Sequence, residues 1–504
     1  MLKLFFKKLF SSKSTLEHKN MDLIPETRDK MSAEFKKRLQ DSADILENEI
    51  GISGMTLFSI GTLIDKNMLH RDIIDPLKDL PFDSMQKIME HLSIGEIDQS
   101  SSMEKAVKAA LDGCVIIYLE GNSTVLLAKI PSEVGRSVSY SQNESLVIGP
   151  QMAFTESIMT NITLVRNYIK NSSLCIENLQ AGARTNKLVS IVYINGIASE
   201  QMVGSLRKRI QEIKIDGILD SSMLEQLLAE NSLTIFPQMA LTERPDRVSD
   251  WLLKGKLAVF VDGSSLAIVC PQSFMEFFQS MEDSNVNWQI ATFWRLLRFI
   301  ALFLSVFFTA LYVASLTYHY EVIPQTLLFT LSESRAKVPF PPIVEALLLE
   351  FIMELLREAG ARLPTKVGQT MGIVGGIVIG TAAVDAGFTS NILIIIISLG
   401  ALGSFVTPSY TMGNVIRIIR FPLIILAGCL GFYGMMYGFC FLLLHLLRQS
   451  SLGSPYLAPF YPPRFADWKD SIIRLPLSFT NKRPDLTMAE DEYKYDPIRA
   501  KKHT

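Results

Sequence analysis

The sequence predicts an α/β region over its first 290 residues, followed by an all-α membrane domain. Charge is unevenly distributed: residues 291–447 hold 16 Asp, Glu, Lys and Arg in 157 positions, about 10%, against about 24% elsewhere. That block contains uncharged runs long enough to cross a bilayer. The earlier part alternates patterns typical of strands and helices, which favours α/β packing in two lobes.

These shifts in composition divide the chain into five expected parts. They are a basic N-terminal segment (1–30), a first cytoplasmic lobe (31–150), a second cytoplasmic α/β lobe (151–290), the membrane domain (291–447) and a C-terminal cytoplasmic tail (448–504). The N-terminal segment lacks the apolar core and small-residue cleavage site of a signal peptide, so we interpret it as retained. It is suited equally to an anionic membrane surface and to a solvated terminus.

The soluble half contains several elements with a clear hydrophobic period. Helical spacing is found at 28–50, 156–168 and 199–213, and alternating or continuous apolar runs predict strands at 112–119, 123–130, 174–179, 187–194 and 257–262. The strands at 112–119 and 123–130 are separated by a short turn, which predicts a hairpin.

Composition and motifs exclude several classes of function. With 49 Lys and Arg against 51 Asp and Glu, the chain has no bulk electrostatic attraction to nucleic acid. Its five cysteines are scattered and form no C-x-x-C pair, and its six histidines never lie within four residues of one another. Phosphate-loop, dinucleotide, metalloprotease and esterase motifs are absent from the sequence. We therefore expect no enzyme activity, no catalytic residue, no metal site and no cofactor.

Four uncharged stretches are the candidate membrane spans, at 299–320, 367–384, 386–416 and 421–447. Arg295, Arg298 and Arg448 would place both ends of this block in the cytoplasm. Arg417 and Arg420 then fall outside, against the same rule. Either the segment 343–359 re-enters the membrane or a fifth crossing changes the count.

The segment 343–359 follows Pro341 and Pro342 and stops at Gly360, which predicts a helix. At 100° per residue its acidic residues form one stripe, made of Glu350, Glu354 and Glu358. One interpretation is an interfacial helix with a solvated acidic face. The other is that an oligomer assembles this stripe into an acidic vestibule that favours cations.

The second candidate span has a glycine every four residues, a pattern that lets helix backbones approach closely. These helix-packing glycines are Gly368, Gly372, Gly376 and Gly380. A second stripe of the same helix holds the pore-lining candidates Thr370, Val374, Ile377, Thr381 and Asp385. The alternative is that this stripe packs against another span. The last span carries its own spaced glycines, Gly428, Gly431, Gly434 and Gly438, for which we expect a structural role.

Several strings occur in a recognisable order between Gly149 and Tyr461. They include VYINGIA at 192–198, DGIL at 216–219, FPQ at 236–238, TERPD at 242–246, VDGS at 261–264, FFQSMED at 277–283, VPFP at 338–341, LLREAG at 355–360 and IVGG at 373–376. Read together they resemble the A subunit of the GerA-type spore germinant receptors of endospore-forming bacteria. Gln151 and Met152 depart from the charged pair usual in that family, and the first 145 residues match only loosely.

The resemblance implies a multi-pass protein of the spore inner membrane with a cytoplasmic N-terminal domain. It implies two partners, a transporter-like B subunit that binds the nutrient and a lipoprotein C subunit. It further implies a homo-oligomer, expected as a pentamer, that forms a nutrient-gated cation channel for spore germination. In that hypothesis Val374 and Ile377 form a dry gate, and Thr370 and Thr381 hydrate ions on either side of it.

Two other functions compete with the channel. The protein would otherwise be a non-conducting scaffold that passes a signal from the nutrient-sensing subunit. A secondary transporter is disfavoured, because the sequence has no evident inverted repeat and a single acidic residue, Asp385, at the end of one of its candidate spans.

Overall fold

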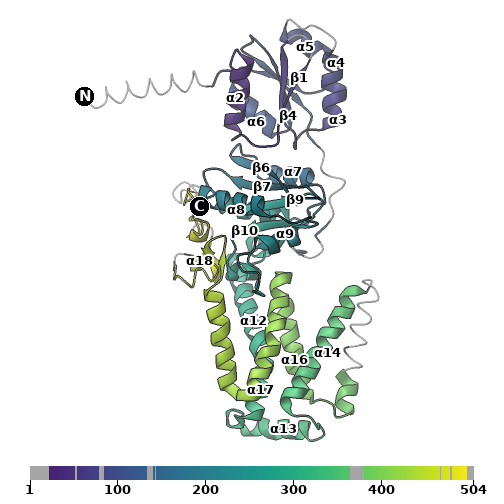
Figure 1. The fold of residues 1–504 in the computed structure, drawn as a ribbon, viewed down its shortest axis with the longest axis vertical. Coiled ribbons are helices and arrows are strands. Elements are labelled where there is room, and N and C mark those ends of the chain that lie inside the picture. Colours follow the sequence, from purple (N-terminus) through teal and green to yellow (C-terminus); the bar gives the residue numbers. More distant parts are fainter. Residues whose placement is uncertain are drawn as a thin grey trace, which may run out of the picture.

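The computed structural model describes residues 22–50, 54–78, 84–132, 140–141, 144–363, 376, 380–465, 467–476 and 479–495. These residues form three tiers along the long axis (Figure 1). A first lobe lies at one end, a second lobe lies in the middle, and a helical part lies at the other end. The final segment of the chain returns to lie beside the second lobe.

The first lobe is an antiparallel five-stranded sheet of order β1-β2-β4-β5-β3. The strands are β1 (Ile45–Ile50), β2 (Met55–Ile60), β3 (Ile97–Ser100), β4 (Cys114–Leu119) and β5 (Val125–Lys129). Its helices are α2 (Arg28–Arg38), α3 (Lys66–Met68), η1 (Leu69–Ile74), α4 (Asp75–Leu77), α5 (Met85–His91) and α6 (Met103–Leu111). Successive side chains of β2 point to opposite faces of the sheet. Leu57 packs in a core with residues of α4 and α5, and Phe58 packs in a second core with residues of α2 and α6. Helices therefore cover both faces of this sheet.

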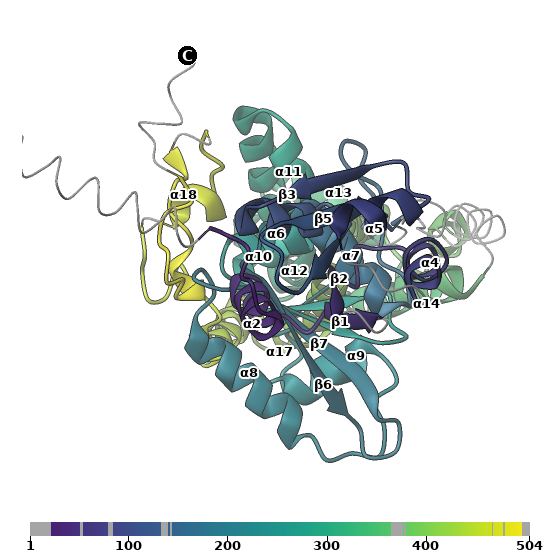
Figure 2. The ribbon, with the colours of Figure 1, turned by 90° about the horizontal axis from the view of Figure 1, so that it is seen from above.

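The second lobe is an antiparallel five-stranded sheet of order β6-β7-β9-β10-β8. The strands are β6 (Leu174–Ala181), β7 (Lys187–Ile194), β8 (Ala240–Thr242), β9 (Leu257–Val261) and β10 (Ala267–Cys270). Its helices are α7 (Ile158–Tyr168), α8 (Glu200–Glu212), α9 (Ser221–Leu228) and α10 (Pro245–Leu253). The core residues place α7 and α10 on one face and α8 and α9 on the other, as the view from above in Figure 2 shows.

The two lobes repeat one topology. In each, a helix precedes the first edge strand, helices separate the second strand from the third, and one helix joins the third strand to the fourth. The fourth and fifth strands then form a hairpin, β4–β5 in the first lobe and β9–β10 in the second. The chain therefore builds the same antiparallel fold twice.

A buried ion pair joins the lobes. Arg166 of α7 donates from Nε and Nη2 to the two carboxylate oxygens of Asp44, at 2.6 and 2.7 Å. The Ser42 and Thr62 hydroxyls donate to the same carboxylate at 2.7 and 2.8 Å. Both charged side chains are almost fully buried. Bidentate pairing with added hydroxyl donors is the arrangement in which a buried carboxylate is well compensated.

The helical part begins where α11 (Glu282–Asn285) leads into α12 (Trp288–Thr317). It continues through η3 (Tyr320–Val322), α13 (Gln325–Arg335), α14 (Pro342–Arg362), helical residues at 380–385, α16 (Asn391–Phe405) and α17 (Tyr410–Leu447). Among the described residues, only α12 and α17 are long and apolar enough to cross a membrane. The expected number of about four spans is therefore not confirmed. The span expected at 367–384 lies mostly outside the described residues, and α16 has only 15 residues.

Helix α17 corrects one expected boundary. We expected spans to meet at Arg417 and Arg420, but a helix runs through both arginines from Tyr410. The break lies at Gly431, whose φ of 63° and ψ of −141° suit glycine alone. Beyond it the helix folds back, because Gly434 and Gly438 pack against Leu423 and Leu426 of its first half (Figure 1). Gly431 therefore allows the turn, and Gly434 and Gly438 allow the two halves of α17 to pack closely.

The segment expected as a C-terminal tail is instead folded against the second lobe. It contains β11 (Ser450–Ser451), β12 (Ser454–Pro455), α18 (Trp468–Ser471) and η5 (Asp485–Thr487). The Tyr456 hydroxyl donates to the Pro237 carbonyl at 2.7 Å, and Arg483 Nε donates to the Leu253 carbonyl at 2.9 Å. This segment and α12 therefore both attach to the second lobe.

Most elements expected in the soluble half are present. The 112–130 hairpin, the two strands between 174 and 194, the strand at 257–262 and the helices near 156–168 and 199–213 are confirmed. The helix expected at 28–50 is wrong in its second half. It ends at Arg38 because Gln40 and Asp41 adopt positive φ, and residues 45–50 pair with β2 instead.

Candidate functional site in the helical part

The site is organised by α14, which carries acidic side chains at successive levels. Pro342 occupies the first turn, where its missing N–H removes no helical hydrogen bond. The helix then runs from the α13 end of the helical part back towards the lobes (Figure 1). Its carboxylates at Glu345, Glu350 and Glu354 each lie next to an arginine from another position in the fold.

At the middle level, Glu350 and Arg420 of α17 form a buried ion pair. Arg420 Nη1 donates to Glu350 Oε2 at 2.6 Å, and the Thr309 hydroxyl of α12 donates to Oε1 at 2.9 Å. Arg420 Nη2 donates to the Ser305 hydroxyl at 2.9 Å and to the Gly400 carbonyl of α16 at 3.3 Å. Glu350 is 1% exposed and Arg420 is 2% exposed.

This network ties four helices together. Ionised groups are expensive to bury, so a pair survives in an apolar interior only with good geometry and further hydrogen bonds. Here the pair itself joins α14 to α17. Helix α12 adds the Ser305 and Thr309 hydroxyls, and α16 adds the Gly400 carbonyl. Removing either charge would leave the other buried without a partner, and the four helices would lose their common contact.

Towards the lobes, α14 borders an open cleft of about 1060 Å³ between itself and the facing ends of α16 and α17. Glu354 lines this cleft, bonded to Arg357 and 4.0 Å from Arg417 Nε. Glu358 also lines it and pairs with Arg362 at 2.6 Å on an exposed surface. The cleft therefore contains both signs of charge.

At the opposite end of α14, Glu345 fixes the start of α16. Its Oε1 accepts from the Ser390 backbone N–H at 2.7 Å and from the Thr389 hydroxyl at 3.0 Å. Its other oxygen lies 3.4 Å from Arg335 Nε of α13. A carboxylate at a helix N-terminus is favourable because it satisfies free N–H groups there.

The acidic stripe expected from the sequence thus divides into two environments. Glu350 is enclosed by four helices, whereas Glu354 and Glu358 face the cleft. The expected solvated face holds for Glu358 and does not hold for Glu350. Each of the three carboxylates has an arginine partner within this chain.

The glycine span is described only in part. Five of its predicted residues lie outside the described residues: Gly368, Thr370, Gly372, Val374 and Ile377. Of the others, Gly376, Thr381 and Asp385 are exposed and Gly380 is partly exposed. A Cβ placed on Gly376 or Gly380 would meet no heavy atom of the described residues within 4 Å. The described part of the predicted packing face therefore has no partner helix among those residues.

Sequence reasoning missed the partners of the acidic stripe. The uncharged stretches place Arg420 at a boundary between spans, and no sequence pattern marks Glu345, Ser305 or Thr309. The available signal was a charged residue flanked on both sides by long apolar runs, since such a residue is buried only with a partner. Only the tertiary structure shows that Arg420 is the partner of Glu350, because the two residues are 70 positions apart in the chain.

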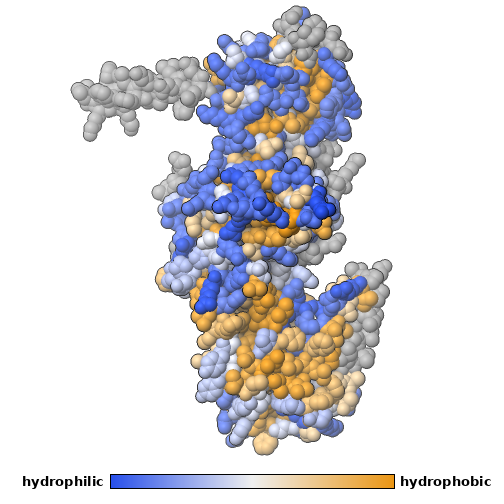
Figure 3. Space-filling view, viewed as in Figure 1, coloured by the Kyte–Doolittle hydropathy of each residue, from blue (hydrophilic) through white to orange (hydrophobic). Residues whose placement is uncertain are grey.

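Apolar residues gather over the helical part on the face shown in Figure 3, below the hydrophilic lobes. Two α/β lobes joined to a helical part with an apolar surface and a buried ion pair define a class of two-part protein, with a polar α/β region and an apolar helical region. No metal-ligating group of three or more His, Cys, Asp or Glu is present in the described part of the chain.

Comparison with known proteins identifies the family. The family described as Bacillus/Clostridium GerA spore germination protein matches residues 33–486, so the chain belongs to the GerA family. It is 44% identical to spore germination protein GerQA of Bacillus cereus, over 95% of this chain and 97% of that protein. It is 38% identical to spore germination protein KA of Bacillus subtilis, over 93% of this chain and 88% of that protein.

The chain is also similar to a solved structure. It is the crystal structure of the N-terminal domain of the A subunit of the Bacillus megaterium spore germinant receptor GerK3. The similarity covers 50% of this chain and 97% of that one, with 27% identity and a TM-score of 0.39.

Proposed function

We propose that this protein is the A subunit of a nutrient-responsive germination receptor that oligomerises, as a pentamer, into a cation channel of the spore inner membrane. It works with a nutrient-binding, transporter-like B subunit and a lipoprotein C subunit, and opening the channel releases ions and triggers germination. Membership of the GerA family supports the germination role. The observation that carries the channel role is the exposure of Gly376, Thr381 and Asp385.

The membrane placement is supported by α12 and α17, which are the long apolar helices of the described residues. Both ends of the helical part contact the second lobe: Arg298 of α12 bonds to the Phe278 carbonyl, and His445 of α17 bonds to Thr234. Both ends then lie on one side of the membrane. We assign that side, with both lobes, to the cytoplasm.

The oligomer is supported by the exposed residues Gly376 and Asp385. In a bilayer, exposed small residues are suited to close contact with another helix, and an exposed carboxylate needs water or a polar partner. Gly376 has open space beside it among the described residues, and Asp385 is exposed. A second copy of the chain provides both a helix for the glycines and a shared aqueous path for Asp385.

In this arrangement the stripe Thr370, Val374, Ile377, Thr381 and Asp385 lines the pore, with the two apolar residues as the gate. Glu354 and Glu358 line the vestibule, because they border the open cleft. Glu350 joins them only when its pair with Arg420 separates. Closed and open states would then differ in that buried pair.

The test is cation flux from proteoliposomes that contain this chain with its B and C partners, with and without candidate nutrients. Val374→Ala should raise the flux without nutrient, because a smaller side chain lets water enter the gate. Asp385→Asn should reduce cation over anion selectivity several-fold. Glu212→Gln, an exposed change in the second lobe, is the matched control and should leave both quantities unchanged. Normal, tightly gated flux in both pore variants would contradict the assignment.

A scaffold that conducts no ions is the second candidate, and one contact favours it. Asp283, fully buried beside the first turns of α12, accepts from both Arg295 and Arg298, at distances of 2.8 to 3.0 Å. This buried ion-paired junction suits the transmission of movement between lobe and helix. Full assembly with B and C but no nutrient-dependent flux would select the scaffold.

A further inference from the structure

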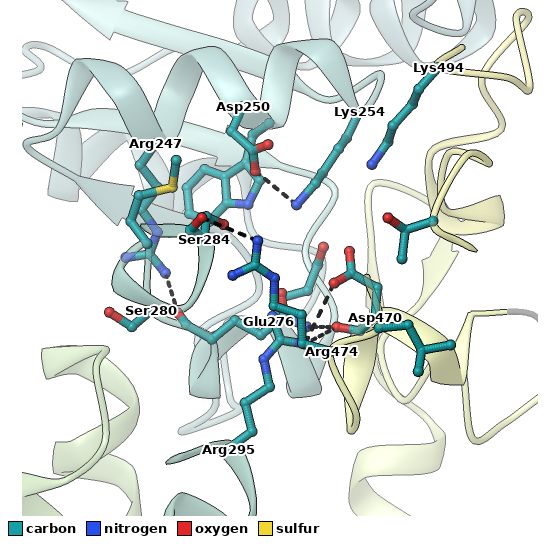
Figure 4. A pocket seen from close by; sticks show the side chains of 15 residues that line it. Arg247, Asp250, Lys254, Glu276, Ser280, Ser284, Arg295, Asp470, Arg474 and Lys494 are labelled. Carbon is teal, nitrogen blue, oxygen red and sulfur yellow. Dashed lines mark hydrogen bonds and ion pairs between the residues drawn. The ribbon is translucent and has the colours of Figure 1, made fainter. Parts of the chain in front are cut away.

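A separate pocket lies where the second lobe, the start of α12 and the C-terminal segment meet (Figure 4). Its volume is about 90 Å³. One wall is α10, a second is the η2 (Phe274–Phe278) to α12 region, and the third is the C-terminal segment. Its charged lining side chains are Arg247, Asp250, Lys254, Glu276, Arg295, Asp470, Arg474 and Lys494. Five of these are cationic and three are anionic, so the lining carries excess positive charge.

Three of the five cations are neutralised by neighbouring carboxylates. Lys254 Nζ lies 2.8 Å from Asp250, and Arg247 Nη1 lies 3.0 Å from Glu144. Arg295 pairs with both Asp283 and Asp470. Glu276 is also occupied, because the buried Lys256 ammonium lies 2.7 Å from it. The carboxylates around the pocket therefore already have partners.

Arg474 and Lys494 are the two cations that remain. Arg474 donates to the Ser284 carbonyl at 3.2 Å, and no carboxylate of the described residues lies within 4.0 Å of either cationic group. Figure 4 shows Lys254 and Lys494 directed into the space between α10 and the C-terminal segment, with Arg474, turned towards Ser284, lining the same pocket. Burial lowers the pKa of the Lys494 ammonium and the positive charge of Lys254 lowers it further, although the nearby carboxylates of Asp470 and Asp250 act in the opposite direction. An anion in this space would oppose both effects.

We propose that this pocket binds a phosphate group, held by Arg474 and Lys494 with Lys254 at its edge. A guanidinium fork and two ammonium groups are the side chains that bind phosphate in proteins, because they supply several charge-assisted hydrogen bonds. The pocket is small and enclosed on three sides, which suits a compact tetrahedral anion. Bound phosphate would link the C-terminal segment to the lobe and to the start of α12.

The phosphate has two possible sources. The pocket adjoins the start of α12, where the exposed apolar side chains Trp288, Phe293 and Leu296 begin. If the helical part is inserted as proposed above, this level coincides with lipid headgroups, and basic pockets at that depth bind anionic lipids. The other source is free phosphate from the cytoplasm. The same residues would hold either one.

The test uses the full chain in nanodiscs of phosphatidylcholine and two probes, inorganic phosphate and short-chain dihexanoyl phosphatidylglycerol. Trp251 lines the pocket and serves as a fluorescence reporter, with Trp251→Phe as the signal control. We expect a saturable change with at least one probe. Arg474→Gln and Lys494→Gln should each weaken apparent affinity about tenfold or more, the effect of losing one charge-assisted bond.

Lys469→Gln is the matched control, since Lys469 lies on the same segment, is exposed and does not line the pocket. Lys494→Arg keeps the charge and should retain most of the binding, which keeps the test valid if Arg474→Gln fails to fold. Response to phosphate alone identifies a free anion, and response to phosphatidylglycerol alone identifies a lipid headgroup. No saturable change with either probe, or equal affinity in Lys494→Gln and Lys469→Gln, overturns the proposal.

Discussion

The two lobes share one strand order but occupy different positions in the molecule. The first lobe contacts the second through the Asp44–Arg166 pair and the neighbouring hydroxyls, and through polar contacts nearer its surface such as Lys170 with Asp112. The second lobe contacts the first lobe, α12, α17 and the C-terminal segment. The same fold therefore serves once as an outer domain and once as the centre of the assembly.

The equivalent helices α6 and α10 show how the sequence produces this difference. Helix α6 buries an apolar face and leaves its charged residues, including Glu104, in solvent. Helix α10 buries Asp246 and Arg247 together with its apolar face. These two side chains have partners outside the helix: Asp246 pairs with Arg244, and Arg247 bonds to Glu144 and to the Gln279 carbonyl. The two lobes therefore share a fold, and the buried polar side chains of α10 give the second lobe contacts that α6 does not make in the first.

The largest expected effect is at the junction of the second lobe with α12. Asp283→Asn should lower the free energy of unfolding by about 3–5 kcal/mol, because two buried arginines lose their shared counter-charge. Denaturant unfolding of the detergent-solubilised chain measures the loss. Glu104→Gln changes an exposed residue of α6 in the first lobe, and it should change the free energy of unfolding by less than about 0.5 kcal/mol. Similar small effects for both variants would show that the second lobe is no more central than the first.

A smaller effect is expected between the lobes. Arg166→Met should destabilise the chain by about 2–3 kcal/mol, at the low end for a broken buried pair, because the Ser42 and Thr62 hydroxyls still bond to Asp44. We expect the first lobe to unfold as a separate transition in a thermal scan. Arg184→Met removes an exposed pair with Asp216 and should stay within about 0.5 kcal/mol. One unchanged cooperative transition in Arg166→Met would show that other contacts couple the lobes.

The smallest expected effect is a pH dependence of stability that arises in the second lobe. Burial raises the pKa of Glu225 on α9 from 4.5 to about 7. The folded state therefore holds this proton more tightly than the unfolded state, so stability is greatest below about pH 4.5 and falls as pH rises to about 7. The loss should be about 1–2 kcal/mol, since partial exposure reduces the desolvation.

Unfolding midpoints measured across that pH range check the Glu225 prediction. Glu225→Gln should remove this component of the pH dependence, because the amide does not titrate. An identical pH profile in the variant and the unchanged chain would assign the dependence to other groups.

Much of the soluble fold follows from local sequence pattern. The hairpin at 112–130 and strands such as 187–194 were predictable because their apolar runs and bounding turns are local. The helix expected through residue 50 failed because the positive φ at Gln40 and Asp41 and the pairing of residues 45–50 with β2 are not encoded in helical spacing. The shared topology of the two lobes was also not visible, since strand order is a property of long-range pairing.

In the helical part, the sequence predicted which residues are acidic and which face they share, but not their environment. The stripe of Glu350, Glu354 and Glu358 follows from helical geometry alone. Whether each carboxylate meets solvent, an arginine or a cleft depends on which helices surround it. Glu350 is buried because Arg420, Thr309 and Ser305 come together around it from three other positions in the chain.

By itself, the sequence determined that this chain has a polar α/β half and an apolar helical half, and its ordered strings carry the resemblance to the GerA family. Charge density and hydrophobic period are properties of neighbouring residues, so they can be read without a fold. Only the tertiary structure decided that α17 continues through Arg420 and turns at Gly431, and that the C-terminal segment encloses the pocket at Arg474 and Lys494. Those outcomes depend on pairs of charged or tightly packed residues far apart in the chain, because the free energy of burying a charge is set by the partner it meets.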